Sequence, residues 1–239
     1  MIVLRSLLFN AVYFGSTALL LIPSLFIRLF APRRALALAM LWARVEVAAV
    51  RLICGIRLTV SGLEHLPREG AALIASRHES AFDTMVWLTL LPRASYVLKS
   101  ELERIPLFGG IVRPAGMIPV DRDGGATAMR QLMRDGIRAV AERRQIVIFP
   151  EGTRGESGTL LPLHPGVAAL AFSTKLPVIP VVTDSGRLWG RRSFRKHPGT
   201  IHIRILPPLP TNLKRPELMA RLEKSLRDGL LDIGSGRPL

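Results

Sequence analysis

The first 54 residues contain two long apolar runs. No charged residue occurs at 6–27, and about 20 apolar residues are enough to cross a bilayer as a helix. Pro23 interrupts this run, and a second apolar stretch follows at 35–53 after a short segment that contains arginines. The pattern fits either one spanning helix or a helical hairpin immersed in one leaflet. Both interpretations predict attachment to a membrane.

From residue 57 onward, short β-branched or apolar runs alternate with segments of helical period and with turn residues. These runs predict strands at 57–61, 71–76, 95–98, 117–120, 146–149, 178–182 and 200–206. Helices are predicted at 82–91, 126–143, 166–175 and 216–230. Such alternation is typical of an α/β sheet with helices on its faces. We therefore expect an α/β domain with a mixed or parallel sheet at 55–239, preceded by a two-helix membrane-embedded motif at 1–54.

Two prolines mark the strand predicted at 178–182. Pro177 precedes this strand and Pro180 lies within it. Because proline cannot donate a hydrogen bond to a neighbouring strand, prolines in a strand favour a position at the edge of a sheet. We therefore expect this strand to be an edge strand.

The overall charge changes the picture, because it requires an anionic partner. The 239 residues carry a formal net charge of +15. A membrane surface, an anionic substrate and nucleic acid are the candidates. Only 6% of the residues are aromatic and no nucleic-acid-binding motif is present, so nucleic acid is not expected. A single cysteine, Cys54, excludes an internal disulfide and a multi-cysteine zinc site, and no metal-ligand spacing occurs, so we expect no metal.

Candidate chemistry begins at residues 76–83, Ser-Arg-His-Glu-Ser-Ala-Phe-Asp, which follow a predicted strand and open a predicted helix. Active-site groups of α/β folds are often displayed at such a junction. With His78 in the turn and Asp83 in the first helical turn, the carboxylate can bond one imidazole nitrogen and leave the other to accept a proton. The pair would then be a general base for a hydroxyl. By itself, the spacing also fits a surface histidine beside a helix-start aspartate.

Two further segments follow predicted strands and offer groups for an anion. The first ends in Asp121 and Arg122, which alone would form an ordinary turn. The second consists of Glu151, Gly152, Thr153 and Arg154. Glycine permits a ligand to approach the backbone, Thr153 can donate to a phosphate oxygen, and Arg154 can bind phosphate through two bonds. Neither a Gly-x-Ser-x-Gly nucleophile motif nor a Gly-x4-Gly-Lys phosphate loop is present.

Taken in order, these segments resemble the glycerolipid acyltransferase family, specifically the bacterial 1-acyl-sn-glycerol-3-phosphate (lysophosphatidate) acyltransferases. That family shows Asn-His-x4-Asp, Gly-x-x-Phe-x-Asp-Arg, Glu-Gly-Thr-Arg and a Val-Pro-Val-x-Pro strand. The matching positions here are His78 and Asp83, then Gly116, Asp121 and Arg122, then 151–154, then Pro177 and Pro180. Lys99, Glu101, Leu102, Pro106 and Gly109 are similar to the family's Lys-x-Glu-Leu…Pro…Gly segment. The resemblance spans about residues 55–210.

The resemblance implies a role for each matching residue. His78 would deprotonate the acceptor hydroxyl, and Asp83 would orient and stabilise the histidine. Arg122 and Arg154 would hold the glycerol phosphate of the acceptor, and Lys99 would add to them. Glu151 and Gly152 would shape the loop, which also carries Thr153 as a donor to the phosphate. The donor would be acyl-CoA or acyl carrier protein, no cofactor is implied, and acylation of the sn-2 hydroxyl of lysophosphatidate would give phosphatidate. Since a thioester already has a good leaving group, no covalent enzyme intermediate is required.

Three positions depart from the family's pattern and leave the acceptor headgroup open. Arg77 stands where asparagine is common, Pro119 where an aromatic is usual, and His164 where many members carry a lysine. Lysophosphatidylglycerol or a lyso-amino-acid lipid is the nearest alternative acceptor. A non-catalytic basic module that binds membranes or nucleic acid is the alternative from a different class. For the enzyme, the expected location is a bacterial inner membrane, with the catalytic domain on the cytoplasmic side.

Overall fold

The computed structural model describes residues 1–106 and 108–234 of the 239-residue chain. Within them, a seven-stranded sheet has the order β1-β7-β6-β2-β5-β3-β4. Its strands are β1 (Ile56–Ser61), β2 (Ala72–Ser76), β3 (Ala94–Lys99), β4 (Ile118–Val120), β5 (Gln145–Ile148), β6 (Val178–Thr183) and β7 (Gly199–Ile205). All the predicted strands are confirmed, and their ends differ from the prediction by one residue at most.

The sheet is mixed, because one pair of neighbours runs antiparallel. β6 and β7 form that pair, and every other neighbouring pair is parallel. The strands β2, β3, β4, β5 and β6 therefore run in one direction, and their C-terminal ends lie along one edge of the sheet. In open α/β sheets, ligands bind at that edge.

The expectation of an edge strand at 178–182 is wrong, since β6 lies between β7 and β2. Pro180 is tolerated there because its missing donor falls where the ladder with β7 ends. The antiparallel register begins at Val181, opposite Ile205, and the Pro180 carbonyl accepts a 2.9 Å hydrogen bond from the Leu206 N–H. Pro180 thus turns its backbone groups toward β7, and the parallel pairing with β2 loses no donor.

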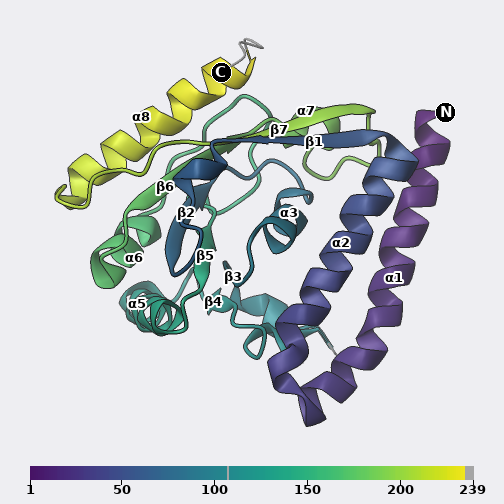
Figure 1. Cartoon of the computed structure of the whole chain (residues 1–239), viewed down its shortest axis with the longest axis horizontal. Helices are drawn as coiled ribbons and strands as arrows, with labels where there is room; N and C mark the ends of the chain where they lie inside the picture. The colour runs from purple at the N-terminus through teal and green to yellow at the C-terminus, as the bar shows by residue number, and fades with distance from the viewer. Residues whose placement is uncertain (107, 235–239) are drawn as a thin grey trace.

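Helices cover both faces of the sheet. They are α1 (Ile2–Phe30), α2 (Ala35–Cys54), α3 (Asp83–Leu90), α4 (Gly109–Val112), α5 (Gly125–Ala141), α6 (Gly166–Thr174), α7 (Ser185–Leu188) and α8 (Arg215–Gly234). Alternate side chains of β2 enter two apolar cores, with Leu73 and Ala75 in one and Ala72 and Ile74 in the other. α5, α6 and α8 pack on the first face, and α3 with the α1–α2 pair packs on the second (Figure 1). The predicted helices of this region are confirmed.

The N-terminal residues fold into a hairpin of two helices, α1 and α2, joined by a 3-10 turn at Pro32–Arg34. α1 continues through Pro23 without a break. Its outward face is apolar and exposed, and includes Leu4, Leu7, Phe14, Leu19, Ile22, Phe26 and Phe30. In the described part of the chain, α1 is the one helix that is long and apolar enough to cross a membrane.

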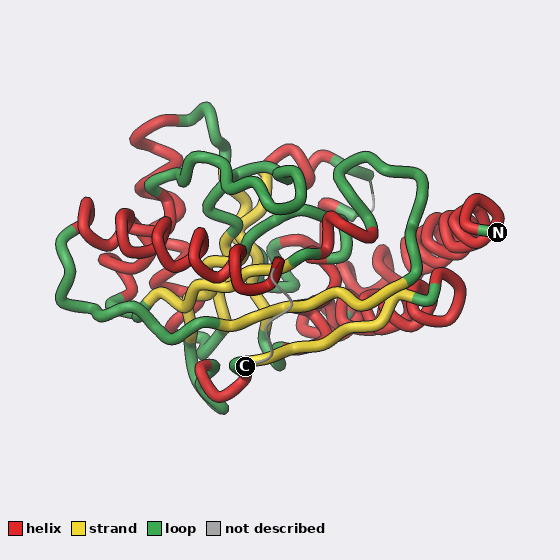
Figure 2. The backbone as a smooth tube through the Cα atoms, turned by 90° about the horizontal axis from the view of Figure 1, so that it is seen from above, coloured by secondary structure: helices red, strands yellow, loops and turns green. Residues whose placement is uncertain are grey.

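α1 contacts the sheet domain near both of its ends. Toward the N-terminus, Ser6 Oγ accepts a 2.9 Å hydrogen bond from the Lys196 N–H. Toward the C-terminus, Arg28 lies against Gly110 of α4, where a Cβ would stand 2.5 Å from Arg28 Cδ. α1 therefore lies along the domain beside α2, as Figure 2 shows from above.

Candidate active site

The junction between β2 and α3 lies at the C-terminal edge of the sheet. Ser80 starts the helical turn there, since its Oγ accepts a 3.1 Å bond from the Phe82 N–H and its carbonyl accepts a 3.3 Å bond from the Asp83 N–H. This turn brings Asp83 back toward His78. Both side chains are buried, with His78 9% exposed and Asp83 1% exposed.

His78 and Asp83 form a hydrogen-bonded pair, with Nδ1 and Oδ2 3.1 Å apart. The same carboxylate oxygen accepts 2.8 Å bonds from the backbone N–H groups of Glu79 and Ser80. Three donors on one oxygen fix the direction of the carboxylate. With Asp83 as its partner, Nδ1 is assigned the proton and Nε2 is left as the acceptor. The geometry is that of a histidine poised to take a proton.

Two aromatic rings support the histidine. Phe149, which follows β5, stacks on His78 with ring centroids 4.1 Å apart and 19° between the planes. Tyr96 of β3 stacks beyond Phe149 at 6.0 Å, and its hydroxyl donates to the Asp83 backbone carbonyl at 3.3 Å. Burial raises the pKa of Tyr96 well above its ordinary value, and the Asp83 charge adds to this effect, so the hydroxyl stays a donor. In the sequence both residues look like ordinary core aromatics, which is why neither was expected here.

Arg154 reaches the second nitrogen of the histidine. Its Nε lies 3.4 Å from His78 Nε2, a long hydrogen bond. Arg154 therefore places a fixed positive charge beside His78 Nε2.

The segments around Arg122 and Arg154 meet at Gly152. This glycine has φ of +68°, and a Cβ built on it would lie 2.8 Å from His164 Cδ2 and 3.9 Å from Arg122 Nη1. The left-handed backbone and the close approach both require glycine. Arg122, which follows β4, is thus adjacent to the loop at 151–154. The structure brings together two segments that are far apart in the sequence and that both offer arginines.

Lys99 and Glu101 lie at the same edge as Arg122. Burial lowers the pKa of Arg122, and the Glu101 charge opposes that effect, so these two side chains interact. Lys99 Nζ is 3.8 Å from Glu101 Oε1, and both of these side chains are exposed. An exposed pair of this kind contributes little, so Lys99 can exchange its partner for an anionic ligand. Thr153 is exposed beside Arg154.

Glu151 turns to the inner side of its loop, where it is 2% exposed. Its Oε1 pairs with Arg77 Nε at 3.0 Å, and its Oε2 accepts a 3.0 Å bond from the Leu161 N–H. Protein partners therefore occupy both carboxylate oxygens. A contribution of Glu151 to ligand binding would have to act through the shape of the loop.

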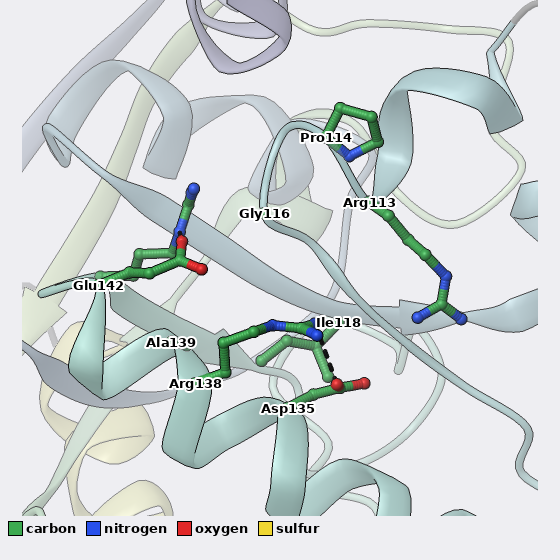
Figure 3. A pocket seen from close by; sticks show the side chains of 9 residues that line it. Arg113, Pro114, Gly116, Ile118, Asp135, Arg138, Ala139 and Glu142 are labelled. Atoms are coloured by element: carbon green, nitrogen blue, oxygen red, sulfur yellow. Dashed lines mark hydrogen bonds and ion pairs between the residues drawn. The ribbon is translucent and has the colours of Figure 1, made fainter. Parts of the chain in front are cut away.

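A pocket is also present at the opposite edge of the sheet, between the end of α5 and the segment before β4 (Figure 3). Arg138 and Asp135 line it and form an ion pair of 3.0 Å. None of the described residues that line this pocket is a histidine. Across residues 1–106 and 108–234, no group of three or more His, Cys, Asp or Glu side chains is placed to hold a metal ion. The pocket thus has no counterpart of His78 at the C-terminal edge among its described lining residues.

The family model for acyltransferases matches residues 57–184, more than half of the 239-residue chain. The chain belongs to the acyltransferase family. This acyltransferase is 33% identical over 183 residues to the 1-acyl-sn-glycerol-3-phosphate acyltransferase of Pseudomonas aeruginosa, which covers 77% of this chain and 71% of the relative. The protein of the same name from Limnanthes douglasii is 32% identical over 208 residues, 86% of this chain and 70% of the relative. The human alpha form is 28% identical over 192 residues, 80% and 68% of the two chains.

Among solved structures, the crystal structure of the 1-acyl-sn-glycerophosphate acyltransferase from Thermotoga maritima covers 100% of both chains with a TM-score of 0.79. Its sequence identity to this acyltransferase is 20%, so this likeness shows a shared fold. The family and its named relatives identify the chain as an enzyme and decide against the non-catalytic binding module.

Proposed function

We propose that this acyltransferase moves a fatty acyl chain from a thioester donor to the sn-2 hydroxyl of lysophosphatidate, giving phosphatidate in phospholipid biosynthesis. The proposal is carried by the buried His78–Asp83 pair, in which His78 Nε2 lies 3.4 Å from Arg154 Nε. A proton acceptor and a cation this close together suit the hydroxyl and the phosphate of one small acceptor. The names of the relatives from Pseudomonas aeruginosa, Limnanthes douglasii and human support the same acceptor.

The proposed reaction needs a base, because the hydroxyl is the poor reactant and the thioester already has a good leaving group. His78 Nε2 takes the hydroxyl proton as the oxygen attacks the thioester carbonyl. The tetrahedral intermediate then breaks its C–S bond, and the imidazolium returns the proton to the departing thiolate. Asp83 holds the Nδ1–H and stabilises the imidazolium during the attack. Acyl-CoA or acyl carrier protein serves as co-substrate, and the step uses no other cofactor.

The acceptor phosphate is held by the positive charges at the C-terminal edge. These are Arg154, Arg122 and Lys99. A phosphate monoester carries up to two negative charges, and each charge-assisted hydrogen bond to it contributes about 1.5–3 kcal/mol. Gly152 lets the phosphate approach the backbone, Thr153 donates a hydroxyl hydrogen bond, and Glu151 keeps the loop in shape from within.

We place the enzyme in one leaflet of a bacterial inner membrane, with residues 1–54 as the attachment and 55–239 as the catalytic domain on the cytoplasmic side. α1 could span a membrane by its length, but its contacts with Lys196 and Gly110 hold it along the domain. A helix held in this way fits a hairpin immersed in one leaflet better than a spanning helix.

Alkaline carbonate washing of membranes tests this attachment. The exposed apolar face of α1 should keep the full-length protein in the membrane pellet. Quantitative release into the wash would contradict the immersed hairpin and would indicate a peripheral attachment through charge.

The acceptor is tested by offering the purified protein lysophosphatidate, lysophosphatidylglycerol and a lyso-amino-acid lipid, each with acyl-CoA and with acyl carrier protein as donor. We expect phosphatidate, identified by mass, as the main product, and the same reactions show which donor is used. His164, which stands in the place of a lysine, is the reason to include the bulkier acceptors. Preferential acylation of one of them would overturn the lysophosphatidate assignment and leave acyl transfer intact.

A further inference from the structure

Arg77 is a buried cation between two buried carboxylates. Its Nη2 lies 3.1 Å from Glu79 Oε1 and its Nε lies 3.0 Å from Glu151 Oε1, and none of these three side chains has exposed surface. Nη2 also donates to the Thr159 carbonyl at 2.8 Å. Charges removed from water are unfavourable unless they are paired and hydrogen-bonded. The cluster therefore depends on close contact among its members.

The two carboxylates belong to the two segments that form the active site. Glu79 directly follows His78, and Glu151 opens the loop that carries Arg154. Glu79 also accepts a 3.4 Å bond from the N–H of Gly158, farther along that loop. Arg77 thus joins the turn at 76–83 that carries His78, here called the catalytic turn, to the loop at 151–161 that carries Arg154, with one ion pair on each side.

The loop at 151–161 has no helix or strand of its own. It is tied to the backbone of His78 at two points. The His78 N–H donates to Glu151 Oε1 at 3.4 Å, and the His78 carbonyl accepts a 2.8 Å bond from the Gly155 N–H. The place of Arg154 relative to His78 Nε2 therefore depends on the cluster around Arg77.

We propose that Arg77 is a positioning residue for acceptor binding, which holds the 151–161 loop on the catalytic turn so that Arg154 and His78 engage one acceptor together. This inference rests on the proposed function, because it assumes that Arg154 binds the acceptor phosphate. Arg77 has no exposed surface and so acts only through the loop. The family pattern commonly has asparagine at the position of Arg77. Asparagine has no charge and a shorter side chain, so it cannot bridge two carboxylates in this way.

A double-mutant cycle between Arg77→Lys and Arg154→Ala tests the proposal, with KM for lysophosphatidate and kcat measured at about pH 8. Lysine keeps the buried charge but loses the planar fork that reaches both carboxylates. We expect Arg77→Lys to raise KM about fivefold or more and to change kcat less than about threefold. In the Arg154→Ala background, the same change should raise KM less than about twofold, because the phosphate contact has already been removed.

Arg144→Lys is the matched control. The Arg144 side chain is 11% exposed, pairs with Glu142 at 2.6 Å and donates to the Ala115 carbonyl at 2.9 Å, but it lies at the N-terminal edge of the sheet. This change should lower the melting temperature and leave KM as it is. The proposal is overturned if Arg77→Lys raises KM equally in both backgrounds, or if Arg144→Lys raises KM as much as Arg77→Lys.

Should thermal unfolding show that Arg77→Lys does not fold, Glu79→Gln replaces it in the cycle. Glu79→Gln leaves Arg77 paired with Glu151 and removes one charged link to the catalytic turn. The expected pattern is the same, with a rise in KM that shrinks in the Arg154→Ala background. A folded Glu79→Gln enzyme with unchanged KM overturns the proposal. A parent enzyme that does not acylate lysophosphatidate would instead defeat the proposed function, so the two failures are distinguishable.

Discussion

The two edges of the sheet both carry arginines and carboxylates, but they hold them differently. At the N-terminal edge, Arg138 pairs with Asp135 at 3.0 Å, and the arginine side chain is 58% exposed. At the C-terminal edge, Arg77 pairs with two carboxylates without any exposed side-chain surface. The Asp135 carboxylate of the first pair is buried, but water reaches and screens its arginine, so this pair holds its surroundings less firmly than a fully buried one. The buried cluster is bonded to the His78 backbone N–H, and the loop that it holds is bonded to the His78 carbonyl. What distinguishes the C-terminal edge is therefore that its buried charges hold the backbone of the proposed base.

The largest expected difference between the edges concerns the base. His78→Ala and Asp83→Ala should each lower kcat for lysophosphatidate by about 10² or more, since they remove the proton acceptor or the group that orients it. Asp135→Asn, at the N-terminal edge, should change kcat less than about twofold. Steady-state kinetics on variants with a parent-like melting temperature provide the test. Full activity in a stably folded His78→Ala protein would rule out the proposed base.

The arginines of the two edges give the next contrast. Arg154→Ala should raise KM for lysophosphatidate about tenfold or more, because it removes a charge-assisted contact to the phosphate. Arg154→Lys should recover part of the loss, since lysine keeps the charge without the fork. Arg138→Ala should leave KM unchanged. Equal KM values for Arg154→Ala and Arg138→Ala would remove Arg154 from the phosphate site.

Gly152 and Gly70 both have left-handed backbones, and comparing them distinguishes the effect of backbone strain from the effect of a close neighbour. Gly152 has φ of +68° and faces His164, whereas Gly70, before β2, has φ of +94° and nothing within 4 Å of a built Cβ. Alanine at either position should destabilise the fold by about 1–2 kcal/mol. Only Gly152→Ala should also raise KM, about threefold or more, because it displaces the loop from His164. A similar KM for both variants would contradict the role of the Gly152 loop.

The smallest expected effect is on the pH dependence of stability. Burial raises the pKa of Glu79 from 4.5 to about 7, although the Arg77 charge opposes this. Between these values the folded protein holds a proton that the unfolded chain releases, so its free energy of unfolding falls as the pH rises from about 4.5 to about 7. Glu79→Gln lacks this dependence. As the pH rises over this range, the melting temperature of the parent should therefore fall relative to that of Glu79→Gln. A constant difference between the two melting temperatures would show that Glu79 does not titrate there.

The sequence predicts what depends on local pattern. The strands and helices follow from periodicity, and His78 meets Asp83 because five positions separate them across a tight turn. The position of β6 could not be obtained in this way, because Pro180 is tolerated only where the ladder with β7 happens to end. The proline rule considers one strand and not its neighbours.

Contacts between residues far apart in the chain could not be predicted from the sequence either. Arg77 and Glu151 are 74 positions apart, and nothing in either segment indicates that they pair. Ser6 and Lys196 are 190 positions apart, yet their contact is one of those that hold α1 along the domain. In the sequence Tyr96 resembles a core aromatic, and only the folded chain places it beyond Phe149, where its hydroxyl bonds the Asp83 carbonyl.

Acceptor selectivity tests the central claim most directly, because it depends on the base and the phosphate contact together. The measurement is kcat/KM for lysophosphatidate and for lysophosphatidylglycerol, in the parent and in Arg154→Ala. A phosphate monoester offers more charge and less bulk than a diester, so the parent should prefer lysophosphatidate by about tenfold or more, and Arg154→Ala should lose most of that preference. A parent that prefers lysophosphatidylglycerol, or a mutation that penalises both acceptors equally, would contradict the account.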